Sequence, residues 1–263
     1  MNPKRASIVV NSLILVFACL IMMPFVAQAA QSPVVYFSFD NISGDVVKDL
    51  SGFGNDGKMD AGPKVIDAQF GKGVEFANSR VKISASNTLN ANLFQGSFTL
   101  VVWIKPTLVG NAWQQVFRAF RAADSSDTLF VNVNGTLSWR GRVNNTWAGG
   151  MCETAAGLAT ANKWLHVAVV SDTKNFRVYV GGALAKESAF QKTDGSNVNH
   201  YLGGDPPTTG ESYSGAVDDF AIYTVALKEN EIVSIKDRGV EKGLSVEVKG
   251  KLATKWATLK STF

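Results

Sequence analysis

The chain has 263 residues, of which 46% are hydrophobic, with 26 Lys and Arg against 22 Asp and Glu. The basic excess sits at the two ends, at Lys4 and Arg5 and in five Lys residues from residue 240 onward, so the body between them carries 19 basic and 20 acidic residues. A near-neutral body of this length predicts one globular domain and argues against a nucleic-acid partner, which requires a basic face.

Residues 1–29 have the pattern of a secretory signal peptide. Lys4 and Arg5 form a basic start, an apolar run occupies residues 8–26, and Ala27-Gln28-Ala29 is a small-residue cleavage site. The alternative is a membrane anchor, but the core of the apolar run, residues 13–25, is short for a span of about 20 residues. We therefore expect cleavage after residue 29, a secreted protein, and no transmembrane span in the mature chain.

Short apolar or alternating stretches, separated by clusters of Gly, Asn, Asp and Ser, occupy most of the remaining chain. This pattern predicts antiparallel strands in an all-β fold. Asn134-Gly135 and Gly181-Gly182 are two-residue hairpin turns, whereas residues 144–162 lack periodicity and predict a long loop. The expected strands occupy residues 34–40, 70–76, 80–84, 97–105, 116–120, 128–133, 136–142, 163–171, 176–180, 183–190, 199–204 and 213–223.

The hairpins at residues 163–190 carry a family resemblance. The strand Trp-Leu-His-Val-Ala, a polar turn and the strand ending Val-Tyr-Val-Gly-Gly resemble the W-H-H-V-A and Y-V-D-G signature of the laminin-G-like, concanavalin A-like jelly-roll family. Leu165 replaces the first His of that signature and Gly181 replaces the Asp. The second change preserves the turn, because Gly-Gly also adopts the positive φ angles that a tight hairpin requires.

Other blocks match the same family in its order along the chain. They are D-L-S-G-F-G-N-D-G at 49–57, F-G-K-G-V-E-F at 70–76, S-F-T-L-V-V-W-I-K-P at 97–106, N-H-Y-L-G-G at 199–204, Y-S-G-A-V-D-D-F-A-I-Y at 213–223 and A-L-K-E-N-E-I at 226–232. The resemblance covers residues 34–236 and implies an antiparallel β-sandwich of the jelly-roll type with a short C-terminal helix. We expect one such domain over residues 30–239.

Residues 240–263 lie outside the resemblance and form a basic tail. Leu252, Trp256 and Leu259 have the i, i+4, i+7 spacing of an amphipathic helix. A docking segment and a solvated tail both fit this composition, and the sequence does not choose between them.

The resemblance also implies a structural calcium ion, because many members of the family hold one where the first and last strands lie side by side. Calcium takes about six to eight oxygen ligands from carboxylates and carbonyls. The alternative is that these Asp and Asn residues only stabilise turns. The candidate ligands are Asp40, Asn55, Asp56, Asp218 and Asp219.

A second candidate site is a ligand-binding surface around residues 139–147. Aromatic rings there alternate with Arg and Asn, and sugar-binding faces combine an aromatic plane with side chains that bind hydroxyl groups. The alternative is that the Trp rings belong to the sandwich core. The candidate residues are Trp113, Trp139, Arg140, Arg142, Asn145 and Trp147.

Catalysis is not expected from the sequence. Glycosidases need a pair of carboxylates across the scissile bond, and no predicted strand carries such a pair. His166, His200 and Cys152 each occur alone, and His166 and Cys152 are expected in the core.

We therefore predict a secreted recognition or adhesion module that binds a glycan or a cell-surface or matrix protein. The alternatives are a polysaccharide-active enzyme, either a glycosidase or a lyase, and a structural extracellular protein. The oligomeric state is not determined by the sequence.

Overall fold

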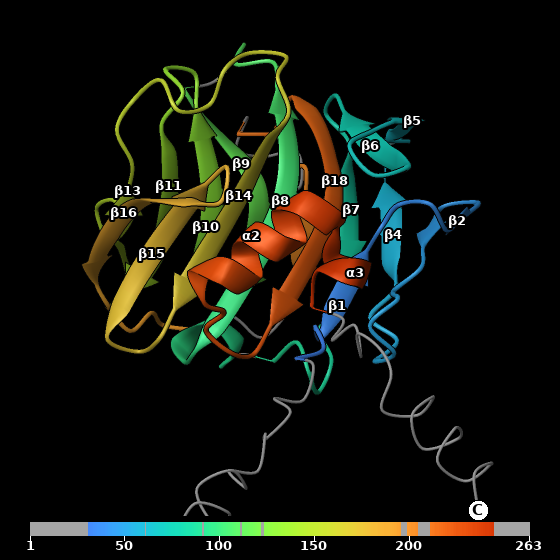
Figure 1. Cartoon of the computed structure of the whole chain (residues 1–263). Helices are drawn as coiled ribbons and strands as arrows, with labels where there is room; N and C mark the ends of the chain where they lie inside the picture. Colours follow the sequence, from blue (N-terminus) through green and yellow to red (C-terminus); the bar gives the residue numbers. More distant parts are fainter. Residues whose placement is uncertain are drawn as a thin grey trace, which may run out of the picture. The chain divides into compact units, whose positions relative to one another are not determined.

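Two antiparallel sheets face each other in the described part of the chain (Figure 1). The computed structural model describes residues 31–244, apart from residues 61, 91, 111, 122–123, 196–198 and 205–210. The predicted signal peptide and most of the predicted tail lie outside these residues. None of the described helices is long and apolar enough to cross a membrane.

The first sheet has eight strands among the described residues. The first strand of the chain pairs with the last, Val35 lying opposite Ile222, as the family resemblance implies. In spatial order the strands are β16 (Ala183–Ala189), β15 (Asn175–Val180), β14 (Leu165–Ser171), β8 (Phe98–Pro106), β18 (Gly215–Tyr223), β6 (Lys72–Phe76) and β5 (Lys64–Asp67), with β1 (Val35–Phe37) also paired to β18.

The second sheet has ten strands among the described residues. The predicted hairpin at Asn134-Gly135 joins two of them. In spatial order the strands are β12 (Thr146–Trp147), β11 (Leu137–Val143), β10 (Asp124–Asn132), β9 (Trp113–Arg121), β17 (His200–Leu202), β7 (Arg80–Ile83), β4 (Gly57–Asp60), β3 (Val46–Val47) and β2 (Ile42–Ser43), with β13 (Cys152–Glu153) paired to β11.

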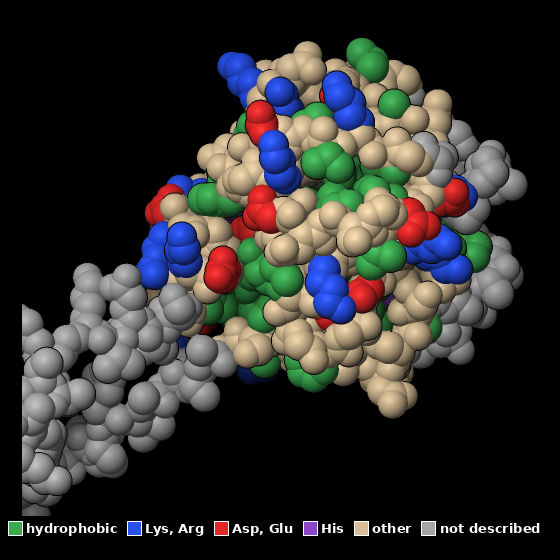
Figure 2. All heavy atoms as spheres, turned by 90° about the vertical axis from the view of Figure 1, so that its right-hand side faces the viewer, with side chains coloured by type: hydrophobic (Ala, Val, Ile, Leu, Met, Phe, Trp, Pro, Cys, Tyr) green, Lys and Arg blue, Asp and Glu red, His purple; other side chains and the backbone are tan. Residues whose placement is uncertain are grey.

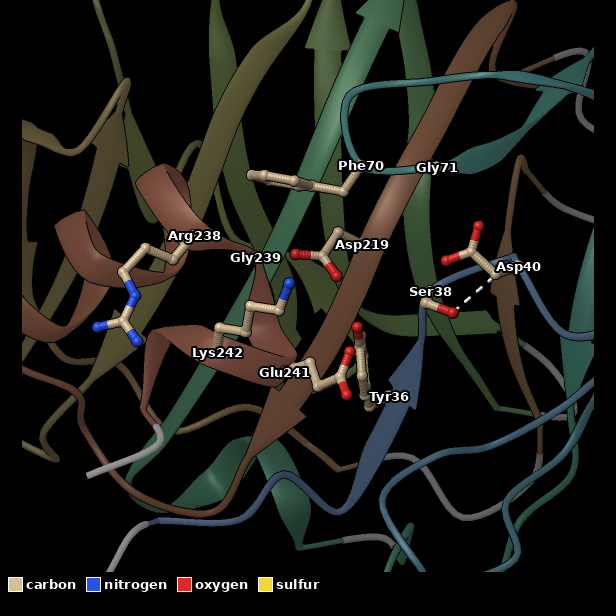
Figure 3. Close-up of a pocket in the computed structure, with 10 residues that line it drawn as sticks. All are labelled: Tyr36, Ser38, Asp40, Phe70, Gly71, Asp219, Arg238, Gly239, Glu241 and Lys242. Carbon is tan, nitrogen blue, oxygen red and sulfur yellow. Dashed lines mark hydrogen bonds between the residues drawn. The ribbon is translucent and has the colours of Figure 1, made fainter. Parts of the chain in front are cut away.

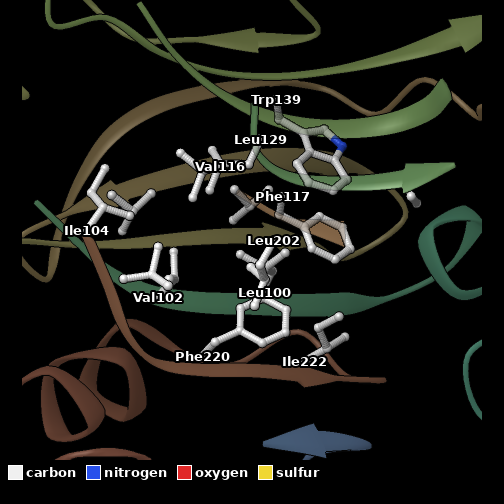
Figure 4. Packing of buried hydrophobic residues seen from close by; sticks show 14 of the residues in the cluster. Leu100, Val102, Ile104, Val116, Phe117, Leu129, Trp139, Leu202, Phe220 and Ile222 are labelled. Carbon is white, nitrogen blue, oxygen red and sulfur yellow. The ribbon is translucent and has the colours of Figure 1, made fainter. Parts of the chain in front are cut away.

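The main core fills the space between the two sheets (Figure 4). Along β8, Leu100, Val102 and Ile104 alternate onto the inner face, as the period of two in a strand requires. Trp139 of β11 is fully buried in the same core, packed against Phe94 and Phe98. Trp139 is therefore a core residue, and its inclusion among the ligand-binding candidates is corrected.

A helical layer covers the outer face of the eight-stranded sheet (Figure 1). α2 (Glu229–Arg238) and α3 (Val240–Gly243) bury Ile232, Ile235 and Val240 against apolar side chains of that sheet. Both described α-helices lie on this sheet. The 3₁₀ turn η1 (Leu93–Gln95) adds Leu93 and Phe94 to the main core.

The edge of the molecule formed by β2 to β6 carries charges of both signs side by side (Figure 2). Exposed ion pairs join Lys58 to Asp45, Lys64 to Glu75 and Lys72 to Asp67. Such pairs contribute little stability, but they leave no excess of basic charge here. This agrees with the near-neutral body read from the sequence.

Candidate functional site

A pocket of about 260 Å³ opens on the outer face of the ten-stranded sheet. We call it the aromatic–arginine pocket, and its lining residues are Trp113, Phe130, Arg140, Trp147 and Glu211. Strand alternation explains its position: Leu129 and Val131 enter the core, so Phe130 between them points outward. The same rule places Arg140 outward beside the buried Trp139.

A stacked pair of side chains forms the wall of this pocket. The guanidinium carbon of Arg140 lies 3.8 Å from the ring centroid of Trp113, within the range of a cation–π interaction. The guanidinium of Arg140 is held over the Trp113 ring by two hydrogen bonds, one to the Glu153 carboxylate at 2.7 Å and one to the Ser138 hydroxyl at 3.1 Å. Phe130 packs edge-on against the Trp113 ring, with centroids 6.0 Å apart.

The β11–β12 hairpin carries the exposed ring of the pocket. Trp147 is 38% exposed, and its ring packs edge-on against Phe130. Arg142 lies over Trp147, with its guanidinium carbon 5.6 Å from the ring centroid, and it donates to the backbone oxygen of Asn145 at 2.6 Å. The Asn144 and Asn145 backbones both have positive φ angles, of 53° and 59°, as this tight turn requires.

The structure therefore brings together only part of the predicted ligand set. Trp113, Arg140 and Trp147 line one pocket. Arg142 and Asn145 are not among its lining residues, and they stabilise the β11–β12 hairpin that carries Trp147.

Glu211 is a pocket residue that the sequence did not indicate. Oε2 of Glu211 accepts a hydrogen bond of 2.6 Å from the side-chain amide of Gln115, which is fully buried. The backbone N–H of Gln115 also donates to the Glu211 carbonyl at 2.9 Å. Glu211 lies 96 residues from Gln115 along the chain, and no local pattern marks such a contact.

A second pocket, also of about 260 Å³, lies where β1 and β18 meet the α2–α3 junction (Figure 3). Its carboxylates are those of Asp40, Asp219 and Glu241, and the hydroxyl of Tyr36 points toward Asp219. Oδ2 of Asp219 accepts a hydrogen bond of 2.7 Å from the backbone N–H of Val240. Asp219 thus holds the first residue of α3 against the sheet.

Asp218 and Asp219 are nearly inaccessible to solvent in β18, with exposures of 0% and 2%. Burial, with a smaller contribution from the charge of Asp219, raises the pKa of Asp218 to about 7. Burial likewise raises the pKa of Asp219 to about 6, with the charge of Asp40 contributing. Oδ2 of Asp218 accepts from the backbone N–H of Phe70 at 2.7 Å. Both carboxyls therefore connect backbone segments.

Asn55 and Asp56 lie apart from these carboxyls. The Asn55 side chain donates to the Val34 carbonyl at 2.7 Å and accepts from the Ser86 hydroxyl at 2.7 Å. Asp56 accepts from the backbone of Asp49 and pairs with Lys48, both at 2.9 Å. The side chains of Asn55 and Asp56 therefore stabilise the loop at residues 49–57.

The predicted calcium ligands thus do not converge as one set. Within the described residues, no three His, Cys, Asp or Glu side chains gather so that they could hold a metal ion. Asp218 and Asp219 each give an oxygen to a backbone N–H. Calcium binding stays a prediction.

His166 and Cys152 are buried, as expected for core residues, and His200 is buried as well. Burial lowers the pKa of His166 to about 3 and that of His200 to about 4. Burial also raises the pKa of the Cys152 thiol. These groups are neutral near pH 7 and shielded from solvent.

Comparison with known families agrees with this architecture. The family model described as the concanavalin A-like lectin/glucanases superfamily matches residues 77–233, more than half of the chain. The chain belongs to this superfamily. The resemblance read from the hairpin at residues 163–190 is thereby confirmed, as is the β-sandwich with a short C-terminal helix. A comparison of this concanavalin A-like chain with curated proteins finds no match.

Solved structures similar to this concanavalin A-like chain include binding domains of two toxins. The binding domain of Paraclostridial Mosquitocidal Protein 1 has a TM-score of 0.63 at 17% identity, covering 78% of this chain and 52% of that one. The binding domain of botulinum neurotoxin DC, solved with rat synaptotagmin II, has a TM-score of 0.62 at 15% identity, covering 78% and 51%. The concanavalin A-like chain spans about half the length of these domains.

A third similar structure is a domain of an enzyme. Domain 4 of AbnA, an extracellular GH43 arabinanase from Geobacillus stearothermophilus, was solved with arabinotriose. It has a TM-score of 0.54 at 18% identity, covering 79% of this concanavalin A-like chain and 99% of that domain. At these identities the three likenesses establish the shared fold and leave the ligand open.

Proposed function

We propose that the protein is a secreted, non-catalytic recognition module that binds a carbohydrate in the aromatic–arginine pocket. The observation that carries this proposal is the placement of Trp147, 38% exposed, next to the Trp113–Arg140 stack and the Glu211 carboxylate. Sugars present an apolar C–H face that packs on aromatic rings and hydroxyl groups that bind charged or amide side chains. The pocket offers both kinds of contact.

The comparisons support a binding module on this fold. Domain 4 of AbnA was solved with arabinotriose, and nearly all of that domain aligns with this chain. The botulinum neurotoxin DC domain was solved with a protein, rat synaptotagmin II, which supports the alternative of a cell-surface protein ligand. The rigid, half-apolar pocket favours the sugar, because a protein partner would need a larger contact surface.

The carboxylate arrangement supports a non-catalytic role. A glycosidase needs two carboxyl groups about 5–10 Å apart on either side of the sugar bond. Among the described residues that line the aromatic–arginine pocket, Glu211 is the single carboxylate, while the nearby Glu153 is paired with Arg140. Asp218 and Asp219 have raised pKa values, but both are buried against backbone N–H groups. They are not positioned to act on a substrate in the aromatic–arginine pocket.

The test is a glycan array followed by calorimetry on the mature protein. We expect a neutral oligosaccharide to bind. Trp147→Ala should weaken its binding on the order of tenfold, because packing of a sugar face on one aromatic ring contributes about 1 kcal/mol or more. Phe53→Ala is the matched control, since Phe53 is an aromatic residue exposed by 53% in the 49–57 loop. Unchanged affinity in Trp147→Ala would contradict the proposal, as would the absence of any glycan ligand.

Secretion is the second part of the proposal and has its own test. Its support is the basic start, apolar run and cleavage pattern of residues 1–29. Expression of the full chain should release a protein into the medium whose first residue is residue 30. A protein of full length retained in the membrane fraction would contradict this part.

A further inference from the structure

Among the described residues, the Glu211 carboxylate accepts a hydrogen bond at one of its two oxygens. The side-chain amide of Gln115 donates to Oε2 of Glu211. The side-chain oxygen Oε1 of Gln115 in turn accepts a hydrogen bond of 3.2 Å from Arg118. Gln115 and Arg118 are both buried, so this arrangement is rigid. Among the described residues, no hydrogen-bond donor reaches Oε1 of Glu211. The carboxylate therefore presents one oriented acceptor to the pocket.

Arg140 presents a complementary donor. Its Nε donates to Ser138 and its Nη2 to Glu153, while its flat face is covered by Trp113. Within the described part of the chain, Nη1 of Arg140 has no acceptor. A guanidinium has its donors in a fixed planar fork, so the direction of the remaining N–H groups is determined by the bonds already made.

The charge of the pocket favours an uncharged ligand. Arg140 is neutralised by Glu153 at 2.7 Å, whereas the side-chain partner of Glu211 is the neutral amide of Gln115. Arg142 is not among the lining residues of the pocket and donates to the backbone oxygen of Asn145. A ligand carboxylate in the pocket would therefore meet the negative charge of Glu211, whose side-chain hydrogen-bond partner is a neutral amide.

We infer that Glu211 and Arg140 act as a pair that selects a neutral sugar with two adjacent ring hydroxyls, and that Glu211 is the main specificity-determining residue of the pocket. Glu211 accepts from one hydroxyl, and Nη1 of Arg140 donates to its neighbour while Trp147 packs on the sugar face. This inference rests on the proposed function, because it concerns the ligand of the same pocket. A site built to bind a hydroxyl rejects an analogue that lacks it.

Calorimetry with defined oligosaccharides tests this selectivity. The panel consists of arabinotriose, xylotriose and cellotriose as neutral ligands, and trigalacturonic acid as an acidic ligand. We expect the wild-type protein to prefer a neutral trisaccharide, and Glu211→Gln to bind it on the order of tenfold more weakly while losing the preference over trigalacturonic acid. Glu75→Gln, at an exposed carboxylate on the other sheet, is the matched control and should behave as wild type.

The outcomes separate the two proposals. A neutral trisaccharide bound equally by wild type and Glu211→Gln overturns the specificity role and leaves the binding module intact. A wild-type preference for trigalacturonic acid overturns the neutral-ligand inference in the same way. Failure of wild type to bind any of the four sugars, together with an empty glycan array, overturns both. Circular dichroism and thermal unfolding of Glu211→Gln confirm that its fold is retained.

Discussion

The guanidinium carbon of Arg140 lies 3.8 Å from the ring centroid of Trp113, on a strand face that points away from the core. Arg140 and Trp113 come from β11 and β9, which are separated by β10. Their contact crosses the sheet above Phe130. It produces an aromatic and cationic wall on the outer face of the ten-stranded sheet, the sheet on which neither described α-helix packs.

Replacing Arg140 by Lys tests whether this planar stack matters for binding. Lys keeps the charge near Glu153 but lacks the planar guanidinium that stacks on Trp113. We expect sugar affinity to fall severalfold, while unfolding in urea shows a change below about 1 kcal/mol, since part-exposed ion pairs contribute little.

The matched control is Arg177→Lys on β15. The Arg177 side chain is 22% exposed and paired with Asp172 and Glu187, much as Arg140 is 24% exposed and paired with Glu153. It should leave sugar affinity unchanged. Equal loss of binding in both variants would show that the effect comes from general loosening of the fold.

Asp218→Asn should stabilise the protein at neutral and alkaline pH. The pKa of Asp218 is about 7 in the fold against an ordinary value of 3.8, so ionising it in the native state is unfavourable. Stability therefore declines as pH rises from about 4, and the full cost is present above pH 7. Asn keeps an acceptor for the Phe70 N–H and carries no charge, so the gain should reach on the order of 2 kcal/mol or more.

The measurement is urea unfolding of both proteins between pH 3.5 and pH 8.5. The stability difference between Asp218→Asn and wild type should be near zero at the acidic end and grow with pH. A difference that stays constant over this range would show that Asp218 is not held protonated by its surroundings.

Asp219→Ala should release α3 from the sheet. The substitution leaves the buried N–H of Val240 without its acceptor, and an unsatisfied buried group costs about 1–3 kcal/mol. We expect faster hydrogen exchange at residues 239–243 and a lower melting temperature. The exposed Asp237 on the preceding helix supplies the control, because Asp237→Ala should leave exchange in α3 as it is.

Gly203→Ala should be strongly destabilising. The backbone φ of Gly203 is +88°, and an added Cβ would lie 2.4 Å from the ring of Phe76, which is 1% exposed. Strain and overpacking together should cost about 2–4 kcal/mol in thermal or urea unfolding. Gly96→Ala, where nothing lies within 4 Å of an added Cβ, should change stability by less than about 1 kcal/mol. Similar values for the two variants would contradict this packing.

The main strands and both marked hairpins could be predicted because their signals are local. Alternation along residues 128–142 and the Asn134-Gly135 turn specify β10 and β11 without reference to the rest of the chain. The strands that were missed, β2 to β5 and β12 to β13, have two to four residues. Segments this short contain too few side chains to show a period, and their pairing partners alone define them.

The sequence by itself determined that Trp139 and Arg140 lie on opposite faces of one strand, because successive side chains alternate. Only the tertiary structure decided that Trp139 faces the core and Arg140 the pocket, since that depends on which face the second sheet covers. Only the tertiary structure placed Glu211 beside Gln115, which is 96 residues away along the chain. It also decided the raised pKa values of Asp218 and Asp219, because these follow from burial by distant segments. Periodicity is a property of neighbouring residues, whereas a binding pocket is made by residues that the folded chain brings together.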